Sequence, residues 1–143
     1  MKLAALALAL VGCSGPVRTV AIDYTATDAQ AQALNRRVSY WNTVLASGSR
    51  IRHADSPDVD VFVVIGDPRN GRAAGWRSTT GRVTVRPDLG DDIFERALGH
   101  ELGLAIGLEH TACGVMEGDS DEYAALEFCD ADINECRAQG ACP

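Results

Sequence analysis

The sequence predicts a single domain of the α+β or mixed α/β class. The chain has 143 residues, close to the size of one domain. Segments typical of strands and amphipathic helices follow in the order strand, helix, strands, helix and a cysteine-rich tail. Hydrophobic residues make up 46% and charged residues 23%, so the chain can form a packed core and is not of the disordered class.

In the first half of the domain, the sequence predicts a strand followed by a helix. Residues 17–24 are rich in residue types that favour strands. Thr27 and Gln30 then fit a capping box, with a hydroxyl at the N-cap and a glutamine three residues later. Apolar residues at spacings of 4, 3 and 4 continue this segment and define one buried helix face: Leu34, Val38, Trp41 and Leu45.

In the second half of the domain, the sequence predicts further strands and two helices. Strands are expected at residues 59–65, near 75–79 and at 82–86, where Pro87 ends the last one. A helix is expected from about residue 93 to 107, capped by Asp91 or Asp92. A last helix is expected at residues 130–139.

The N-terminus has the features of an export signal. Lys2 is followed by nine apolar residues, so we assign residues 1–12 to a signal peptide. Residues 10–13 (Leu-Val-Gly-Cys) resemble the lipobox of bacterial lipoproteins. That resemblance implies a lipidated Cys13, a tether over residues 13–16 and a domain over 17–143. It also implies a bacterial cell-envelope location, with membrane contact through the lipid only. An ordinary secretory signal and a buried apolar start to the domain are the alternatives.

The charge distribution argues against nucleic-acid binding. The net charge is −7, and no apolar run approaches the roughly 20 residues of a membrane-spanning helix. Nine acidic residues lie within 109–143 against Arg137 alone. We interpret them as a solvated surface. Calcium binding is the alternative, because residues 130–134 begin like an EF-hand loop, but Glu135 and Ala141 stand where that loop needs glycine and glutamate.

Four cysteines remain when Cys13 is set aside: Cys113, Cys129, Cys136 and Cys142. An even number of cysteines in an exported domain predicts two disulfides, and all three pairings stay open. A zinc site built from thiolates is the alternative, although the chain has no C-x-x-C pair.

The chemistry-bearing segment is residues 100–110. His100, Glu101, Gly107 and His110 occupy four of the five fixed positions of H-E-x-x-H-x-x-G-x-x-H. The glutamate beside the first histidine can act as a base on a metal-bound water, and the glycine lets the helix stop so that the last histidine turns back to the metal. The segment resembles the zinc signature of the metzincin peptidases, and the matrixin-like branch is nearest. A core helix that happens to contain His100 is the alternative.

The resemblance implies a fold and a set of roles. The implied fold is a mostly antiparallel twisted sheet with a long N-terminal helix, an active-site helix and a small cysteine-rich C-terminal part. His100 and His110 would bind zinc, Glu101 would be the catalytic base and Met116 would pack beneath the metal in a Met-turn. The segment Val83, Thr84 and Val85 would be the edge strand that binds an extended peptide substrate.

The second zinc histidine is missing, because Leu104 occupies its position. A leucine has no lone pair to donate, and catalytic zinc normally has three protein ligands plus water. His53 and Cys113 are the candidate substitute ligands. The sequence therefore predicts a zinc-dependent endopeptidase-like lipoprotein, expected as a monomer, which hydrolyses or binds peptides with impaired catalysis. The alternatives are a non-catalytic peptide- or partner-binding surface lipoprotein and a purely structural one.

Overall fold

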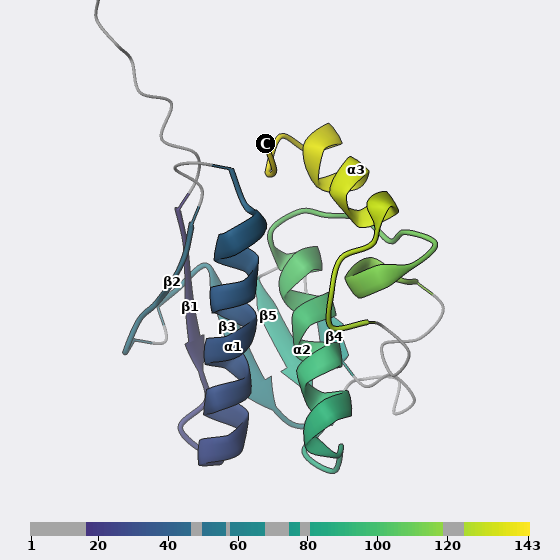
Figure 1. Cartoon of the computed structure of the whole chain (residues 1–143). Helices are drawn as coiled ribbons and strands as arrows, with labels where there is room; N and C mark the ends of the chain where they lie inside the picture. The colour runs from purple at the N-terminus through teal and green to yellow at the C-terminus, as the bar shows by residue number, and fades with distance from the viewer. Residues whose placement is uncertain (1–16, 47–49, 57, 68–74, 78–80, 119–124) are drawn as a thin grey trace, which may run out of the picture.

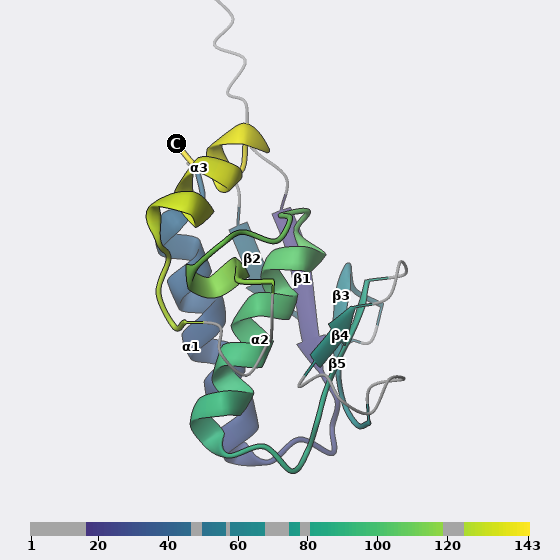
Figure 2. The ribbon, with the colours of Figure 1, turned by 90° about the vertical axis from the view of Figure 1, so that its right-hand side faces the viewer.

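Two long helices lie side by side on one face of a five-stranded sheet (Figure 1 and Figure 2). The computed structural model describes residues 17–46, 50–56, 58–67, 75–77, 81–118 and 125–143. Helix α1 spans Asp28–Val44 and helix α2 spans Asp91–Ala105. The short 3₁₀ helix η1 (Gly114–Met116) and helix α3 (Asp130–Ala138) form the C-terminal part.

The sheet is mainly parallel. Its strands are β1 (Val17–Ile22), β2 (Arg50–His53), β3 (Val61–Ile65), β4 (Gly75–Arg77) and β5 (Arg82–Val85), in the spatial order β2-β1-β3-β5-β4. The first four strands in that order are parallel to their neighbours, and β4 alone pairs antiparallel, with β5. The expected mostly antiparallel sheet is therefore wrong.

The expected long N-terminal helix is also wrong. The first described element is strand β1, and α1, with 17 residues, is similar in length to α2, with 15. Helix α1 leads from β1 to β2, so it is the crossover that two neighbouring parallel strands need. The topology is thus built from a βαβ unit at the start of the domain.

The burial pattern of β3 and β5 does not by itself distinguish a parallel from an antiparallel sheet. Both helices pack on one face of the sheet, so buried and partly exposed residues alternate along β3 and β5. Alternation of this kind is typical of antiparallel sheets with one solvated face, whereas parallel strands are usually buried on both faces. A parallel sheet covered on one face by helices produces the same signal.

Helix α1 forms as its sequence predicts. Thr27 accepts a hydrogen bond from the Gln30 amide, and the Gln30 side chain accepts one from the Thr27 amide, so the capping box is confirmed. Leu34, Val38 and Trp41 are buried in the core, while Leu45 lies just beyond the helix as its C-cap. The apolar stripe therefore faces the sheet and α2.

An asparagine on α1 occupies the outer edge of β2. The Asn42 side-chain amide donates to the Ile51 carbonyl at 2.9 Å, and its oxygen accepts from the Ile51 amide at 2.8 Å. This pair of bonds replaces those that a neighbouring strand would make. Within the described residues, β2 is a terminal strand of the sheet, so the contact satisfies backbone groups at an otherwise open edge.

The cysteine-rich part contains the two expected disulfides. They join Cys113 to Cys129 and Cys136 to Cys142, so these four cysteines do not form a thiolate zinc site. Two disulfides are typical of proteins exported to an oxidising compartment. The segment that begins like an EF-hand loop is the start of helix α3 instead, and Asp132 is fully buried within it.

The export signal and Cys13 lie outside the described residues. Within the part that the structure describes, no helix has both the length and the apolar character needed to cross a membrane.

Candidate functional site

The turn after helix α2 brings the two histidines of the motif together. Helix α2 ends at Ala105, and Gly107 has a φ of +102°, a conformation that side chains disfavour and glycine tolerates. The chain reverses there and returns His110 to the helix. The Nε2 atoms of His100 and His110 lie 3.2 Å apart, and the two rings stack with centroids at 5.1 Å. The predicted role of Gly107 as the turning point is confirmed.

The protonation state of His100 follows from its other nitrogen. His100 is 1% exposed, and its Nδ1 lies 2.9 Å from the carbonyl oxygen of Val115 in η1. A carbonyl can only accept, so Nδ1 carries the proton and Nε2 presents its lone pair toward His110. A metal-binding histidine needs this arrangement, in which a backbone carbonyl holds Nδ1 and leaves Nε2 to bind the metal.

The distance between the histidines suits a shared metal ion. Two nitrogens bound to one tetrahedral zinc at about 2.05 Å lie about 3.3 Å apart. The pair therefore has the spacing of two zinc ligands. It is equally a hydrogen-bonding distance, in which the Nε2–H of His110 donates to Nε2 of His100.

The remaining ligand position does not fit zinc. Leu104 lies one turn after His100 on the same face of α2 and is partly buried. Among the described residues, no group of three histidine, cysteine, aspartate or glutamate side chains could hold a metal ion. The residues present supply two ligands of the three that a catalytic zinc site requires.

Neither substitute ligand joins the pair. Cys113 is bonded to Cys129, so it has no thiolate to offer. His53 ends strand β2 and lines a pocket with Tyr24 and Asp55, away from helix α2. Glu101, the expected base, is 2% exposed and follows His100 directly on α2. The site thus keeps two histidines and the glutamate, with Leu104 at the position of the second zinc histidine.

Met116 packs against helix α2 close to the histidine pair. It is fully buried in η1, and its sulfur fills the space that a Cβ on Gly103 would take. The Trp41 ring approaches the same position to 2.9 Å, and its Nε1–H donates to the Gly99 carbonyl. Gly99 is likewise crowded by Arg37. Close packing explains both glycines inside α2, which would otherwise weaken the helix by about 1 kcal/mol each relative to alanine.

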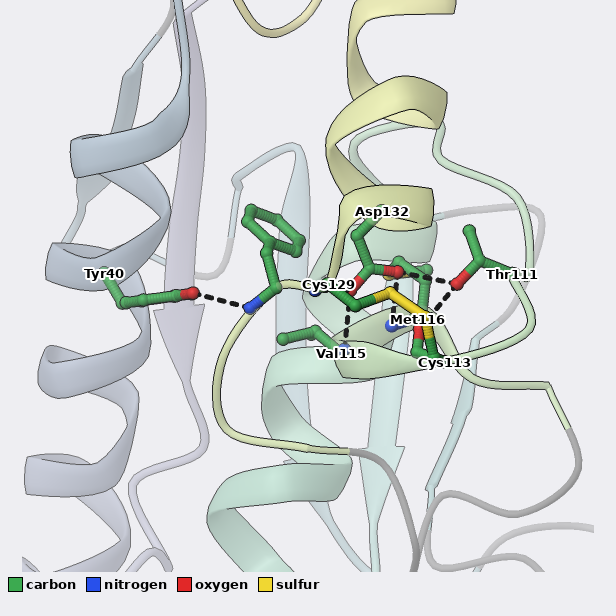
Figure 3. Close-up of a disulfide and its surroundings, with 8 residues drawn as sticks. Tyr40, Thr111, Cys113, Val115, Met116, Cys129 and Asp132 are labelled. Atoms are coloured by element: carbon green, nitrogen blue, oxygen red, sulfur yellow. Dashed lines mark hydrogen bonds between the residues drawn. A yellow bond between two sulfur atoms is a disulfide. The ribbon is translucent and has the colours of Figure 1, made fainter.

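Asp132 is the site residue that sequence reasoning missed (Figure 3). This fully buried carboxylate accepts hydrogen bonds from the amides of Val115 and Met116, at 2.7 and 3.2 Å. It also accepts from the Thr111 hydroxyl at 2.6 Å and from the Cys129 amide at 3.3 Å. Asp132 therefore ties together η1, the histidine loop and the start of α3. Its one sequence signal is an acid three residues after a helix N-cap, where it can accept from the cap amide.

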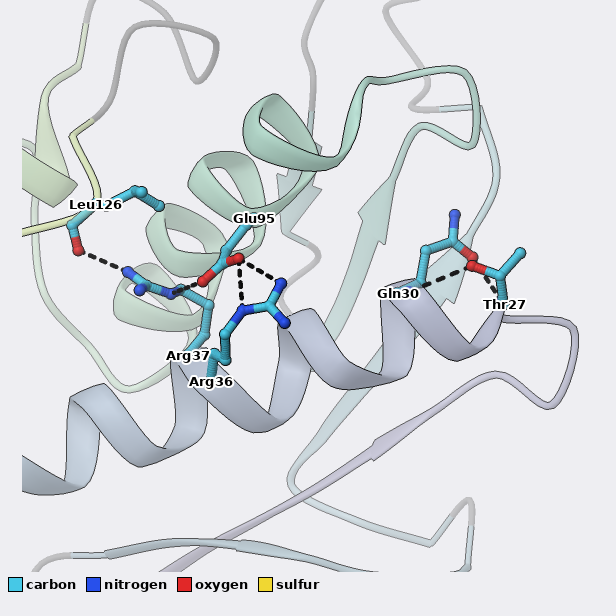
Figure 4. A network of polar contacts seen from close by, with 6 residues as sticks. All are labelled: Thr27, Gln30, Arg36, Arg37, Glu95 and Leu126. Atoms are coloured by element: carbon cyan, nitrogen blue, oxygen red, sulfur yellow. Dashed lines mark hydrogen bonds and ion pairs between the residues drawn. The ribbon is translucent and has the colours of Figure 1, made fainter.

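A network of charged groups fixes α1 against α2 (Figure 4). The Glu95 carboxylate receives the guanidinium groups of Arg36 and Arg37, at 2.6 and 3.0 Å. This contact raises the pKa of Arg36 above its ordinary value. Arg37 is mostly buried and also donates to the Leu126 carbonyl at 2.6 Å. The network holds the chain that follows η1 close to the helix that carries His100.

The expected substrate strand is not an edge strand. Val83, Thr84 and Val85 lie in β5, which pairs with β3 on one side and with β4 on the other. The segment after residue 74 supplies the outer strand, because β4 folds back antiparallel onto β5. The backbone of Val83–Val85 is therefore already paired on both sides, so the expected edge position is wrong, while its contact with a peptide stays a prediction.

Comparisons with known proteins bear on the fold. No family model and no curated protein matches this chain. Similar solved structures include "Structure of Myroilysin", with 17% identity and a TM-score of 0.50 over 66% of this chain and 42% of that chain, and "Crystal structure of myroilysin", with 18% identity and a TM-score of 0.49 over 69% and 48%.

The chain thus spans less than half the length of the myroilysin chains that it resembles. At 17% identity and a TM-score of 0.50, the first likeness shows a shared fold alone.

Proposed function

We propose that this chain is a lipid-anchored, metzincin-like protein that binds peptides and whose zinc-dependent endopeptidase activity is impaired by Leu104. The observation that carries the proposal is the convergence of His100 and His110 to 3.2 Å beside a leucine on the same helix face. A turn that returns one histidine to another across ten residues is the arrangement that a shared metal requires. A leucine at the third position removes one of the ligands.

The surroundings of the pair support the same proposal. Val115 orients His100, Met116 packs under α2, and Glu101 keeps the position of the catalytic base. A fully ligated zinc would polarise a water molecule for attack on a peptide carbonyl. Because the described residues complete only two of three ligand positions, no catalytic step follows from them. The alternative is a relative with no hydrolytic activity, which keeps the scaffold for peptide or partner binding alone.

Zinc stoichiometry tests the metal centre. The mature chain, purified with both disulfides formed, is compared with a Leu104→His variant by elemental analysis after dialysis against micromolar zinc. We expect well under one zinc per chain in the natural sequence and close to one in the variant, because the histidine completes the set. A Leu104→Asn variant is the matched control, since it adds a polar group without a good zinc ligand. Zinc absent from both the natural chain and Leu104→His would overturn the metzincin-like site.

Peptide hydrolysis tests the activity. With a quenched fluorescent peptide library, we expect at least a hundredfold higher rate for Leu104→His with zinc than for the natural chain. Adding Glu101→Gln to that variant removes the expected base and should return the rate to background. A natural chain that already binds one zinc tightly and cleaves peptides at the rate of the variant would contradict the impaired centre.

Membrane anchoring is tested separately. When the full chain is expressed in a bacterium with a lipoprotein pathway, Cys13→Ser should move it from the membrane fraction to the soluble envelope fraction. A soluble natural chain would sink the lipid-anchor part of the proposal and leave the site unaffected.

A further inference from the structure

A pocket lies on the domain away from the histidine pair. It has a volume of about 500 Å³ and opens beside the carboxyl ends of β1 and β2 and the first half of α1. None of its lining residues belongs to α2 or to η1, which carry the residues of the histidine site. It is therefore independent of that site and of the proposed function.

The topology of the sheet favours a ligand site at this place. Strand β1 has β2 on one side and β3 on the other, and the chain leaves β1 through α1 to reach β2. In parallel sheets, ligands bind at the carboxyl ends of the strands, near the point where successive connections run in opposite directions. The pocket occupies this end of β1.

Most of the pocket lining is apolar. Ala21 and Leu34 are buried, and the other four apolar lining residues are partly buried. We call these six side chains the floor: Ala21, Ile22, Ala31, Leu34, Ala54 and Phe62. A volume of this size with apolar walls and a few polar groups at the mouth is typical of sites for small organic ligands.

An exposed aromatic ring stands at the mouth. Tyr24 is 96% exposed, and among the described residues it is the large hydrophobic side chain that is fully open to solvent. Its neighbours at the mouth include Asn35, His53 and Asp55. A solvent-exposed tyrosine beside an apolar cavity can cover an aromatic group that enters it, through ring contacts and, for a cation, through the face of the ring.

The charge at the mouth of the pocket determines whether cationic or anionic ligands are favoured. Asp55 is the carboxylate of the lining, and the lining contains no lysine or arginine. An aromatic compound with an ammonium group matches both the apolar floor and the acidic mouth.

We infer that this pocket binds an aromatic ring that carries an ammonium group, with the ring on the floor and the ammonium beside Asp55. Free arylalkylamines and the amino-terminal aromatic residue of a peptide share this chemistry. The two sources are separated by the probes of the experiment.

The test is an NMR titration of the mature protein with three matched probes. They are 2-phenylethylammonium, the uncharged 2-phenylethanol and the anionic 3-phenylpropionate, which share the ring and differ in charge. We expect shifts at the amides of Ile22, Leu34 and Ala54, with the ammonium probe binding at least fivefold more tightly than the alcohol and the carboxylate most weakly. Equal affinities for the three probes, or shifts confined to the neighbourhood of His110, would overturn the inference.

Two variants test separately what the charge of Asp55 and the apolar floor contribute to binding. Asp55→Asn should remove the advantage of the ammonium probe and leave 2-phenylethanol unchanged, since only the charge is lost. Ala31→Trp should fill the floor and abolish binding of all three probes, and a retained amide spectrum would show that the fold is intact. An Asp55→Asn variant that keeps the fivefold preference would contradict the role of Asp55.

Two peptides distinguish whether the ligand is a free amine or the amino terminus of a peptide. Phe-Gly-Gly amide has a free ammonium beside its ring, whereas N-acetyl-Phe-Gly-Gly amide does not. Tighter binding of the free peptide than of 2-phenylethylammonium indicates a peptide terminus. Tighter binding of the amine indicates a small molecule. Absence of binding by both would overturn the proposal.

Discussion

Asp132 and His100 are linked through a single residue, Val115. The Asp132 carboxylate accepts a hydrogen bond from the Val115 amide, and the Val115 carbonyl accepts one from Nδ1 of His100. A buried acid on α3 thus sets the position of the peptide unit that orients a buried histidine on α2. The two residues are 32 positions apart in the sequence.

Removal of this acid should destabilise the domain and disturb the histidine. Asp132→Ala leaves buried amides without an acceptor, so we expect a loss of about 3 kcal/mol in the free energy of unfolding, measured in urea. The Nδ1 proton resonance of His100 should also shift. Asp130→Ala is the control on the same helix, because Asp130 is exposed; its cost should stay near 0.5 kcal/mol. Equal costs for the two variants would contradict the role of Asp132.

Gly103→Ala should destabilise the domain although alanine favours helices. Its new methyl group would collide with the Met116 sulfur and the Trp41 ring, so we expect a net loss of about 2 kcal/mol by thermal or chemical unfolding. Gly90→Ala is the control, since an added Cβ at Gly90 has open space around it. A Gly103→Ala protein as stable as Gly90→Ala would show that Met116 can move aside freely.

Gly107→Ala should separate the two histidines. The backbone φ of +102° is strained for alanine, so we expect about 1–2 kcal/mol of destabilisation and loss of the ring contacts between His100 and His110 in NMR spectra. Gly90→Ala is the control, because Gly90 has a φ of −60° and an added Cβ there has open space around it. Unchanged histidine contacts in Gly107→Ala would contradict the turn as the cause of the pairing.

The two disulfides should contribute unequally. Cys113–Cys129 closes a loop with a sequence separation of 16, and Cys136–Cys142 one of 6. Chain-entropy arithmetic gives about 3 kcal/mol for the first and about 2 kcal/mol for the second. Paired serine variants test this by urea unfolding. We also expect the first pair, but not the second, to alter the His100 resonances, since Cys113 precedes η1. The reverse order of effects would be inconsistent with this arrangement.

Asp60 should make a small, pH-dependent contribution to stability. The amide and hydroxyl of Thr19 donate to its carboxylate and lower the pKa of Asp60 below the ordinary value of 3.8. A lowered folded-state pKa means that the contribution is fully present above about pH 4 and is lost as the pH falls through the folded-state value. Asp60→Asn should therefore cost less than about 1 kcal/mol at pH 7, because Asp60 is exposed, and its cost should shrink as the pH falls below about 4. Asp58→Asn, also at an exposed position, is the control; the same pH dependence in both variants would exclude the Thr19 contact as the cause.

Local signals in the sequence were sufficient for individual elements. The capping box at Thr27 and the apolar stripe through Leu34, Val38 and Trp41 depend on neighbours within one helix, and both are confirmed. The pairing of His100 with His110 was also predictable, because a ten-residue segment with a glycine turn contains all of its determinants. The number of disulfides followed from the cysteine count, whereas their pairing did not.

Features that depend on distant contacts were missed. Strand direction is decided by how α1 and the loops connect β1, β2 and β3, and the antiparallel direction was only an implication of the family resemblance. The edge position assigned to Val83–Val85 failed for a related reason, since the short β4 folds onto β5. Asp132 could not be singled out among nine acids because its partners in η1 lie 16 and 17 residues upstream.

The contact between Asn42 and Ile51 has a consequence for how copies of this protein meet. An open edge of a sheet can recruit a strand from another molecule, which starts aggregation. At β2 the amide of Asn42 already uses the hydrogen-bonding groups of Ile51, so a second molecule would first have to displace that side chain. A single asparagine on a neighbouring helix thereby protects this side of the domain from self-association through β2.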